Sequence, residues 1–309
     1  MLKLGVMGMS EGNQHPYSWA AIINGDYDQK TMDRCGSPYP PVYLKANRDT
    51  LGIHGARVTH VWTQDRTISE HIARASMIET VVDRIEDFIG AVDAVLLLRD
   101  DPSKHVEMSR PLIDAGVPLF IDKPLAYTWE DLDYFSDAVA AGKHIVSCSS
   151  MRYSAGVQAS RVTLPTLGRI RLSIATGKKD LRKYAIHYLE GMFSLLGDPT
   201  VTAVQHVSCR AGEDVLYLEF EDGMVATVHV FMDIAPAGTL IVYGEEGSME
   251  VSHGGAYPSF RNTATEAIRG FLEGKPRLDF EKTRNVIGAL IAAKESLMHE
   301  GSRITLPRA

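Results

Sequence analysis

The sequence predicts an α/β protein in which a doubly wound parallel sheet is followed by an α+β domain built on an open, mainly antiparallel sheet. Three observations support this fold class. The first half of the chain alternates apolar strand patterns with amphipathic helix patterns. From Gly168 onward, strand patterns follow one another directly and are joined by Asp-Gly and Glu-Gly turns. The length of 309 residues is large for one core and favours two domains.

In the first half we expect five strands and five helices. The strands span residues 3–7, 58–63, 94–98, 119–121 and 144–148, and the helices span residues 18–24, 68–76, 85–89, 104–115 and 129–141. Gly116 and Gly142 follow the last two helices, as is typical of helix C-termini. An extra segment, residues 26–56, contains Ser37-Pro38-Tyr39-Pro40-Pro41. We expect it to be non-helical and to serve as a lid or an oligomer contact.

In the second half the strand patterns dominate. They span residues 169–176, 201–209, 215–220, 225–231, 239–243 and 249–252, and two helices follow at 263–272 and 281–299. Residues 225–231 place apolar side chains on both faces of their strand. One face must meet the helices, so we expect a partner to cover the other and predict a homodimer or homotetramer.

Composition excludes several classes of protein. A net charge of -7 and a pI near 5.9 argue against nucleic acid or an anionic membrane as partner. No apolar run approaches the ~20 residues of a membrane span, and Leu2–Met9 is too short for a signal peptide. Cys35, Cys148 and Cys209 are far apart, so neither a disulfide framework nor a thiolate zinc site is expected. We predict a cytoplasmic protein without a metal site.

The tripeptide Asp122-Lys123-Pro124 comes directly after the apolar strand at 119–121. A lysine at the carboxyl end of a parallel strand points into the crevice where doubly wound sheets bind ligands. Pro124 lacks a backbone donor, so the chain must leave the sheet at this point. We therefore expect Lys123 to be displayed rather than buried; the alternative is a surface lysine beside a turn.

With its flanks, Val92–Leu98 upstream and Leu125-Ala126 downstream, this tripeptide resembles the Glu-Lys-Pro signature of the glucose–fructose oxidoreductase, inositol dehydrogenase and MocA (Gfo/Idh/MocA) family, with aspartate in place of glutamate. The resemblance covers nearly the whole chain. It implies a Rossmann-like dinucleotide-binding domain over residues 1–150 and an α+β domain for substrate binding and oligomerisation over residues 151–309. His105 matches a histidine of the family's Thr-Pro-Asn-x-x-His pattern, and we do not assign it to catalysis.

The loop after the first strand is the expected phosphate site because it follows a strand and opens a helix. Its spacing departs from Gly-x-Gly-x-x-Gly: Ser10 takes the second glycine's place and Asn13 the third's. A serine can donate to a phosphate and an asparagine tolerates left-handed φ, so we predict cofactor contacts from Gly8, Ser10, Asn13 and His15. Gly8–Gly12 also spells Gly-x-Ser-x-Gly, but a hydrolase serine would not follow the very first strand.

The end of the second strand usually carries an acid for the adenosine ribose. Thr63 takes that position here, with Asp65 and Arg66 close behind, so the sequence does not decide between NAD and NADP. We predict that these three residues contact the cofactor. Further cofactor contacts are predicted for Arg99, Asp122 and Lys123.

The resemblance implies that His187 acts with Lys123 in catalysis, because a histidine stands here before a helix that ends in Leu196-Gly197-Asp198-Pro199. An imidazole titrates near neutrality and can take a hydroxyl proton. The alternative is a packing histidine beside Tyr184 and Glu190.

The family usually has aspartate where Lys183 stands. Lys183 belongs to a basic cluster, which is either a site for an anionic substrate or a solvated loop; its members are Lys178, Lys179, Arg182 and Lys183. We predict substrate contacts from Lys183, Tyr184 and Arg152.

The resemblance thus implies an NAD(P)-dependent oxidoreductase that removes a hydride from a secondary hydroxyl of a sugar, cyclitol or sugar-acid derivative. Two alternatives stay open. One is an NAD-dependent glycosidase or lyase that works through transient oxidation. The other is a non-catalytic ligand-binding protein with a degenerate dinucleotide site.

Overall fold

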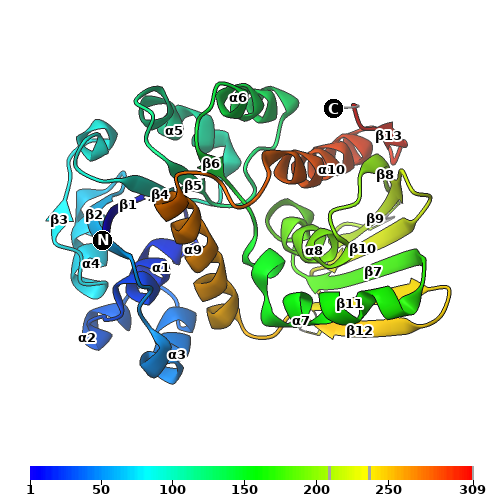
Figure 1. Cartoon of the computed structure of the whole chain (residues 1–309), viewed down its shortest axis with the longest axis horizontal. Helices are drawn as coiled ribbons and strands as arrows, with labels where there is room; N and C mark the ends of the chain where they lie inside the picture. The colour runs from blue at the N-terminus through cyan, green and yellow to red at the C-terminus, as the bar shows by residue number, and fades with distance from the viewer. Residues whose placement is uncertain (208–209, 236–237, 308–309) are drawn as a thin grey trace. The chain divides into compact units, whose positions relative to one another are not determined.

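The computed structural model describes residues 1–207, 210–235 and 238–307, which form two compact units (Figure 1). Unit 1 comprises Met1–Ala126, Asp133–Ser147 and Phe260–Phe280. Unit 2 comprises Tyr127–Leu132, Cys148–Ser259 and Glu281–Ala309. These units differ from the predicted domains 1–150 and 151–309, because the chain returns to unit 1 at Phe260–Phe280. Cys209 lies outside the described residues.

Unit 1 is built on a six-stranded sheet in which all paired strands are parallel. Its strands are β1 (Leu2–Met7), β2 (Ala56–Trp62), β3 (Thr80–Val81), β4 (Ala94–Leu97), β5 (Leu119–Ile121) and β6 (Ile145–Val146). The spatial order is β3-β2-β1-β4-β5-β6, the order of a doubly wound dinucleotide-binding sheet. Strands β4 and β5 are completely buried, as a parallel sheet covered on both faces requires. The predicted fold class of the first half is confirmed.

Helices surround this sheet. They are α1 (His15–Asn24), α2 (Gln29–Met32), α3 (Tyr39–Ala46), α4 (Arg66–Ala75) and α5 (His105–Asp114), with short 3-10 turns η1 (Arg48–Thr50), η2 (Ile85–Phe88) and η3 (Pro102–Lys104). Two further helices, α6 (Trp129–Ala140) and α9 (Ala256–Glu273), have residues in both units. Helix α1 begins earlier than predicted because Pro16 lies in its first turn, where no intrahelical hydrogen bond is lost.

The prediction that residues 26–56 lack helix is wrong, because α2 and α3 lie there. Pro40 and Pro41 occur in the first turn of α3, where a missing N–H group costs nothing. The side chains of Met32 and Leu44 are completely buried. The backbone of the segment also donates to α1, from Gly52 N to Ile22 O at 2.8 Å. The segment is therefore packed into unit 1.

Unit 2 is built on a seven-stranded sheet. Its strands are β7 (Ile170–Lys178), β8 (Val201–His206), β9 (Glu213–Phe220), β10 (Val225–Phe231), β11 (Gly238–Gly244), β12 (Ser248–Ser252) and β13 (Ile304–Thr305). The order is β12-β11-β7-β10-β9-β8-β13. The pairing is antiparallel except between β10 and β7, so the sheet is mixed rather than purely antiparallel. The mainly antiparallel sheet that the sequence predicts is confirmed.

One face of this sheet is covered by α8 (Leu181–Leu196), which lies on β7, β10 and β11 (Figure 1). The approach is close at Gly177, where an added Cβ atom would lie 1.8 Å from Cζ of Tyr188. Glycine is therefore required at this position of β7. The other helices of unit 2 are α7 (Ala155–Thr163) and α10 (Phe280–Met298), with 3-10 turns η4 (Ser150–Tyr153) and η5 (Leu164–Leu167). No helix in the described residues is both long and apolar enough to cross a membrane.

The opposite face of the sheet carries partly exposed apolar side chains. Ile174 is flanked there by its register partners Thr227 and Ile241, whereas the neighbouring Ser173 and Ala175 are completely buried on the α8 side. Apolar surface of this kind is typical of a protein–protein contact.

We predict that the chain forms a homo-oligomer through this face, and that Ile174→Lys shifts it to the monomer because a charge would have to be desolvated at the contact. Light scattering at micromolar concentration measures the mass. Ile89→Lys, a change at an exposed apolar residue of unit 1, is the matched control and should leave the mass unaltered. A monomeric wild type would contradict the prediction.

Candidate functional site

The carboxyl ends of β1, β4 and β5 meet at one edge of the unit 1 sheet. Strand order reverses between β1 and β4, so this edge contains the topological switch point at which open α/β sheets bind ligands. Three loops leave the sheet here, at residues 8–14, 98–101 and 122–124. Most of the predicted cofactor residues lie on these loops.

The loop after β1 has the backbone of a phosphate-binding turn. Gly8 has φ +80°, and a Cβ atom there would lie 2.7 Å from Cγ of Arg99. Gly12 has φ +78°, and no heavy atom lies within 4 Å of the position of its missing Cβ. Asn13 N donates to Ser10 O at 3.1 Å and closes the turn before α1. The open tip and the helix start behind it fit the pyrophosphate of a dinucleotide.

Asp122 connects the loop after β5 to the start of α1. Its carboxylate accepts from Asn13 Nδ2 at 3.1 Å and from Lys123 N at 2.8 Å, and it lies 2.6 Å from His15 Nδ1. The side chain is 2% exposed. Burial alone would raise the pKa of Asp122, but the His15 charge and hydrogen bond, together with Lys123, hold that pKa well below its usual value. Asn13, His15 and Asp122 thus form one cluster, in which Asn13 and Asp122 are buried and His15 is partly buried.

Lys123 does not stand free at the sheet edge. The prediction that it is displayed is wrong, because its side chain is only 7% exposed. Its Nζ atom lies 3.8 Å from Oδ2 of Asp100, a residue of the loop after β4. Asp100 also accepts a hydrogen bond from the Ser10 hydroxyl at 2.6 Å, and its own N–H donates to Ser10 Oγ at 3.1 Å. The peptide bond between Lys123 and Pro124 is cis.

The predicted ribose contacts lie at the end of β2, where each has a partner in its own segment. Thr63 is buried and its hydroxyl donates to Asp65 O at 2.7 Å. The Asp65 carboxylate caps α4 by accepting from Thr67 N at 2.7 Å. Arg66 is exposed and pairs with Glu70 at 3.1 Å. Their contacts to the cofactor stay predictions.

Arg99 and His105 support the loop after β4. The Arg99 side chain packs against Gly8 and pairs with Asp101. The completely buried His105 ring lies 2.9 Å from both Leu125 O and Arg99 O, so it bridges the loops after β4 and β5. Burial lowers the pKa of His105. Its contacts give it a structural role.

In unit 2, His187 lies on α8. Its Nδ1 atom is 2.6 Å from the hydroxyl of Ser149, which is completely buried at the start of η4. The ring of Tyr184, one turn earlier, lies 5.4 Å from the His187 ring. The contact with Ser149 holds the His187 ring in place at Nδ1.

The basic cluster surrounds the start of α8. The Asp180 carboxylate caps the helix by accepting from Lys183 N at 3.0 Å. Lys179 donates to the Tyr184 hydroxyl and lies over the Tyr184 ring, 4.1 Å from its centroid. Arg182 and Lys183 are exposed. The structure therefore brings Lys183, Tyr184 and His187 together on one helix.

Arg152 is located elsewhere in unit 2. It is only 3% exposed and pairs with Glu190 and, at 2.8 Å, with Asp198. Lys282 reaches the other oxygen of Asp198 at 3.2 Å. Burial would lower the pKa of the Arg152 guanidinium, but these two carboxylates raise it above its usual value. These contacts describe a buried ion cluster in the interior of unit 2.

Sequence reasoning missed three polar residues at these sites: Asp100, Ser149 and His253. Asp100 and Ser149 interact with the candidate catalytic residues. Asp100 stands at the first position of the Thr-Pro-Asn-x-x-His pattern, of which only His105 was matched in the sequence, and Ser149 belongs to no motif. His253 follows β12 and fills the notch at Gly191 of α8, where an added Cβ atom would lie 2.8 Å from His253 Cε1. The ring is 4% exposed, and neither nitrogen has a hydrogen-bond partner among the described residues. Burial lowers the pKa of His253 to about 4.

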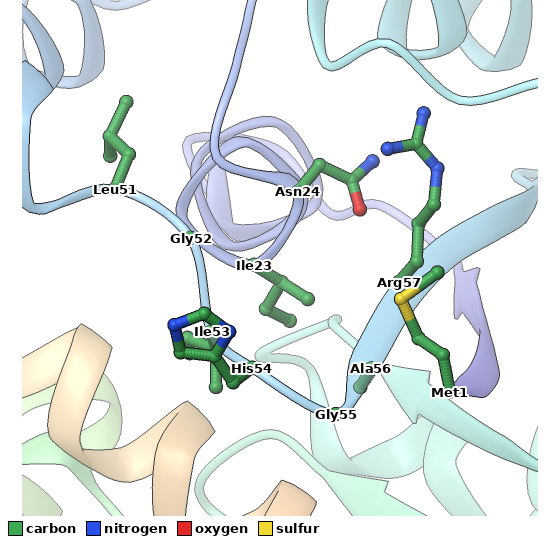
Figure 2. Close-up of a pocket in the computed structure, with 10 residues that line it drawn as sticks. All are labelled: Met1, Ile23, Asn24, Leu51, Gly52, Ile53, His54, Gly55, Ala56 and Arg57. Atoms are coloured by element: carbon green, nitrogen blue, oxygen red, sulfur yellow. The ribbon is translucent and has the colours of Figure 1, made fainter.

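A pocket of about 260 Å³ lies at the other edge of the unit 1 sheet (Figure 2). Met1, Asn24 and Arg57 line it together with the backbone around Gly55. These residues adjoin the amino ends of β1 and β2, whereas ligands of such sheets bind at the carboxyl ends. We therefore do not assign it to the cofactor.

In the described part of the chain, no group of three or more His, Cys, Asp or Glu side chains is arranged to hold a metal ion.

The chain is similar in sequence to known oxidoreductases. Residues 35–149 match the Gfo/Idh/MocA family, an oxidoreductase family with an NAD-binding Rossmann fold. The match begins after the altered glycine loop. Over 67 residues the chain is 33% identical to a proposed UDP-kanosamine synthase oxidoreductase subunit of Amycolatopsis mediterranei (strain S699). That alignment covers 22% of this chain and only 19% of that protein.

Solved structures are similar over the whole chain. The myo-inositol dehydrogenase of Lactobacillus casei, in complex with NAD(H) and myo-inositol, has a TM-score of 0.77 at 18% identity, over 100% of this chain and 98% of that one. The scyllo-inositol dehydrogenase of Lactobacillus casei, with bound NAD(H) and scyllo-inositol, has a TM-score of 0.76 at 13% identity, over 99% of both chains. At these identities the similarity shows the fold.

We predict that the buried His253 makes wild-type stability fall in acid. Its folded pKa of about 4 lies below the usual value of 6.5, so its titration leaves stability unchanged above pH 6.5. As the pH falls from 6.5 toward 4, proton uptake by the ring in the unfolded chain opposes folding progressively. Because each pKa unit corresponds to about 1.4 kcal/mol, the wild type should lose roughly 2–3 kcal/mol relative to His253→Leu over this range. Urea titrations at several pH values measure the free energy of unfolding.

The control for this prediction is His299→Gln, which changes an exposed histidine and should follow the wild-type pH dependence. If the free energy of unfolding of wild type and of His253→Leu depended on pH in the same way, the prediction that folding lowers the pKa of His253 would be wrong.

Proposed function

Because the chain belongs to the Gfo/Idh/MocA family of NAD-binding oxidoreductases, we propose that it oxidises a secondary hydroxyl of a sugar, cyclitol or sugar-acid derivative. The predicted family, the oxidoreductase class and the nicotinamide cofactor are confirmed at the level of the family. The substrate class is the proposal. It is supported by the two inositol dehydrogenases, whose structures contain NAD(H) and an inositol.

One observation carries the proposal. A lysine that is almost completely buried stands after β5 at the carboxyl edge of a sheet with dinucleotide-binding strand order, beside the loop after β1. A buried ammonium group is costly unless it is paired or hydrogen-bonded. Lys123 has a partner in Asp100, and at this edge it can also donate a hydrogen bond to a substrate hydroxyl.

The backbone of residues 8–14 and the start of α1 would hold the pyrophosphate of NAD. When bound, NAD supplies the hydride acceptor. The residues of the chain then handle the hydroxyl and its proton. Lys123 would orient the hydroxyl by hydrogen bonding to its oxygen. The imidazole of His187, whose Nδ1 lies 2.6 Å from Ser149 Oγ, would accept the hydroxyl proton.

A negative charge on the substrate is the second part of the proposal. Lys179, Arg182 and Lys183 gather at the start of α8, where Lys183 lies one turn from His187, in a chain whose net charge is -7. They would favour a carboxylate or phosphate over a neutral polyol. The relative from Amycolatopsis mediterranei, whose name contains a uridine diphosphate sugar, is consistent with this choice.

One observation favours the alternative of a non-catalytic ligand-binding protein. The hydroxyl of Ser10, at the second-glycine position, donates to Asp100 and not to open space, and a carboxylate near the phosphate loop opposes an anionic ligand. NADH binding separates the two functions. The proposed compartment is the cytoplasm, where the buried thiols of Cys35 and Cys148 would stay reduced.

We predict that the wild type binds NADH and that Lys123→Ala and His187→Ala each abolish turnover with little change in NADH affinity. A positioned proton-transfer group contributes about 10²–10⁴ in rate. Fluorescence titration with NADH and NADPH measures binding, and absorbance at the nicotinamide band measures turnover on a panel of inositols, uronates and nucleotide sugars.

Tyr153→Phe, a change in η4 outside the proposed machinery, controls for general damage to unit 2. If neither dinucleotide binds at millimolar concentration, the proposal that the protein is an NAD(P)-dependent enzyme is wrong. Near-normal kcat in His187→Ala would show that this ring only packs.

We predict that Lys183→Asp raises KM for an anionic substrate more than it lowers kcat, because the lost attraction acts equally on the ground state and the transition state. An exposed pair contributes only about 0–1 kcal/mol, so the rise should be a few-fold unless the ligand shields the charges from water. Neutral inositols are the comparison substrates. If wild type and Lys183→Asp both prefer neutral polyols to the same extent, the basic cluster is a solvated loop and not a substrate site.

A further inference from the structure

The serine that replaces the second glycine of the phosphate motif interacts with the loop after the neighbouring strand. Ser10 is 8% exposed, and its hydroxyl donates to Asp100 Oδ1 at 2.6 Å. In return, Asp100 N donates to Ser10 Oγ at 3.1 Å. Two reciprocal bonds to one hydroxyl fix both the position and the rotamer of the Asp100 side chain. A glycine at residue 10 would provide neither.

The second oxygen of the same carboxylate faces the candidate catalytic lysine. Asp100 Oδ2 lies 3.8 Å from Lys123 Nζ, and the two side chains are 11% and 7% exposed. Removing one partner of a buried ion pair leaves the other charge uncompensated, so each group restricts where the other can stand. The Lys123 side chain is flexible on its own because its stem has four rotatable carbons.

We propose that Asp100 is a positioning residue for Lys123, and that Ser10 is the anchor that holds Asp100 in place. The inference rests on the proposed function of Lys123. The dependence runs from the loop after β1, through the loop after β4, to the lysine after β5, across the switch point of the sheet. The altered glycine motif is then a feature that serves catalysis.

The position of Asp100 affects turnover and dinucleotide binding in opposite ways. A fixed ammonium group needs less reorganisation when the substrate hydroxyl arrives, which favours turnover. The same carboxylate stands beside the phosphate loop and repels a pyrophosphate, which weakens dinucleotide binding. Removing its charge should therefore change turnover and cofactor affinity in opposite directions. A residue with a purely structural role would worsen both.

The variants are Asp100→Asn, Ser10→Ala and Ser10→Thr. In Asp100→Asn we expect kcat to fall by about 10- to 100-fold, less than on removal of a proton-transfer group, which costs about 10²–10⁴. We expect the NADH dissociation constant to fall, because the repulsion of the pyrophosphate is removed. Ser10→Ala should show a smaller loss of kcat, because Asp100 keeps its charge but loses its anchor. Ser10→Thr retains the hydroxyl and should restore kcat toward wild type.

A second readout tests the pairing without any substrate. Reductive methylation with formaldehyde and cyanoborohydride, followed by mass spectrometry of the Lys123 peptide, measures how freely the amine reacts. Lys123 should be modified several-fold faster in Asp100→Asn and in Ser10→Ala than in wild type. Asp101→Asn is the matched control, since Asp101 is the adjacent acid and pairs with Arg99 instead. Its Lys123 labelling should equal that of wild type.

Circular dichroism and thermal melting establish that each variant is folded, and a variant that fails this check is replaced by Asp100→Ser in both assays. Weaker NADH binding together with unchanged Lys123 labelling in the folded Asp100 variant would overturn the proposal. Failure of the proposed function would give a different result, because Lys123→Ala would then keep its turnover. The difference in Lys123 labelling between the variants and wild type would still decide whether Asp100 holds the lysine.

Discussion

The buried carboxylate of Asp122 joins segments that are far apart in the sequence. It accepts from the side chain of Asn13, contacts the ring of His15 and accepts from the backbone of Lys123. A carboxylate at 2% exposure is stable only with several donors around it, so these contacts must form together. The phosphate loop, the first turn of α1 and the lysine after β5 consequently occupy one fixed arrangement, and the remaining features of the carboxyl edge are built around it.

The departures from the family pattern compensate one another at this edge. Aspartate is one methylene shorter than the glutamate of the Glu-Lys-Pro signature, and Asn13 and His15 provide the donors that surround the shorter side chain. Ser10 is too polar to leave unpartnered, and Asp100 satisfies it. Each substitution looks like a loss when it is compared with a motif one position at a time. In the folded unit each one has a partner from another strand end.

Unit 2 positions its candidate residues by different means. Helix α8 can lie close to the sheet because Gly177 leaves room for the ring of Tyr188. Ser149 contacts Nδ1 of His187 and holds the ring in place. Behind them, Arg152 and its two carboxylates form an ion cluster inside the unit. Such a cluster is weak evidence for stability, but it would be costly to break, because one charge would remain buried without a partner.

Periodicity determined most of the fold in advance, because a repeat of two or of 3.6 residues reports which side chains face a core. It located the longer strands of both sheets and the lysine at the end of β5, but it did not predict the two-residue strands β3 and β13. It failed for residues 26–56, since prolines in a first helical turn resemble those of a loop. The position of Lys123 between a strand end and a proline also led to the wrong expectation that its side chain is displayed. The burial of that lysine and its partner Asp100 depend on side chains from different strands meeting at one edge. Only the tertiary structure could decide them, because no local pattern records which distant residue will neutralise a buried charge.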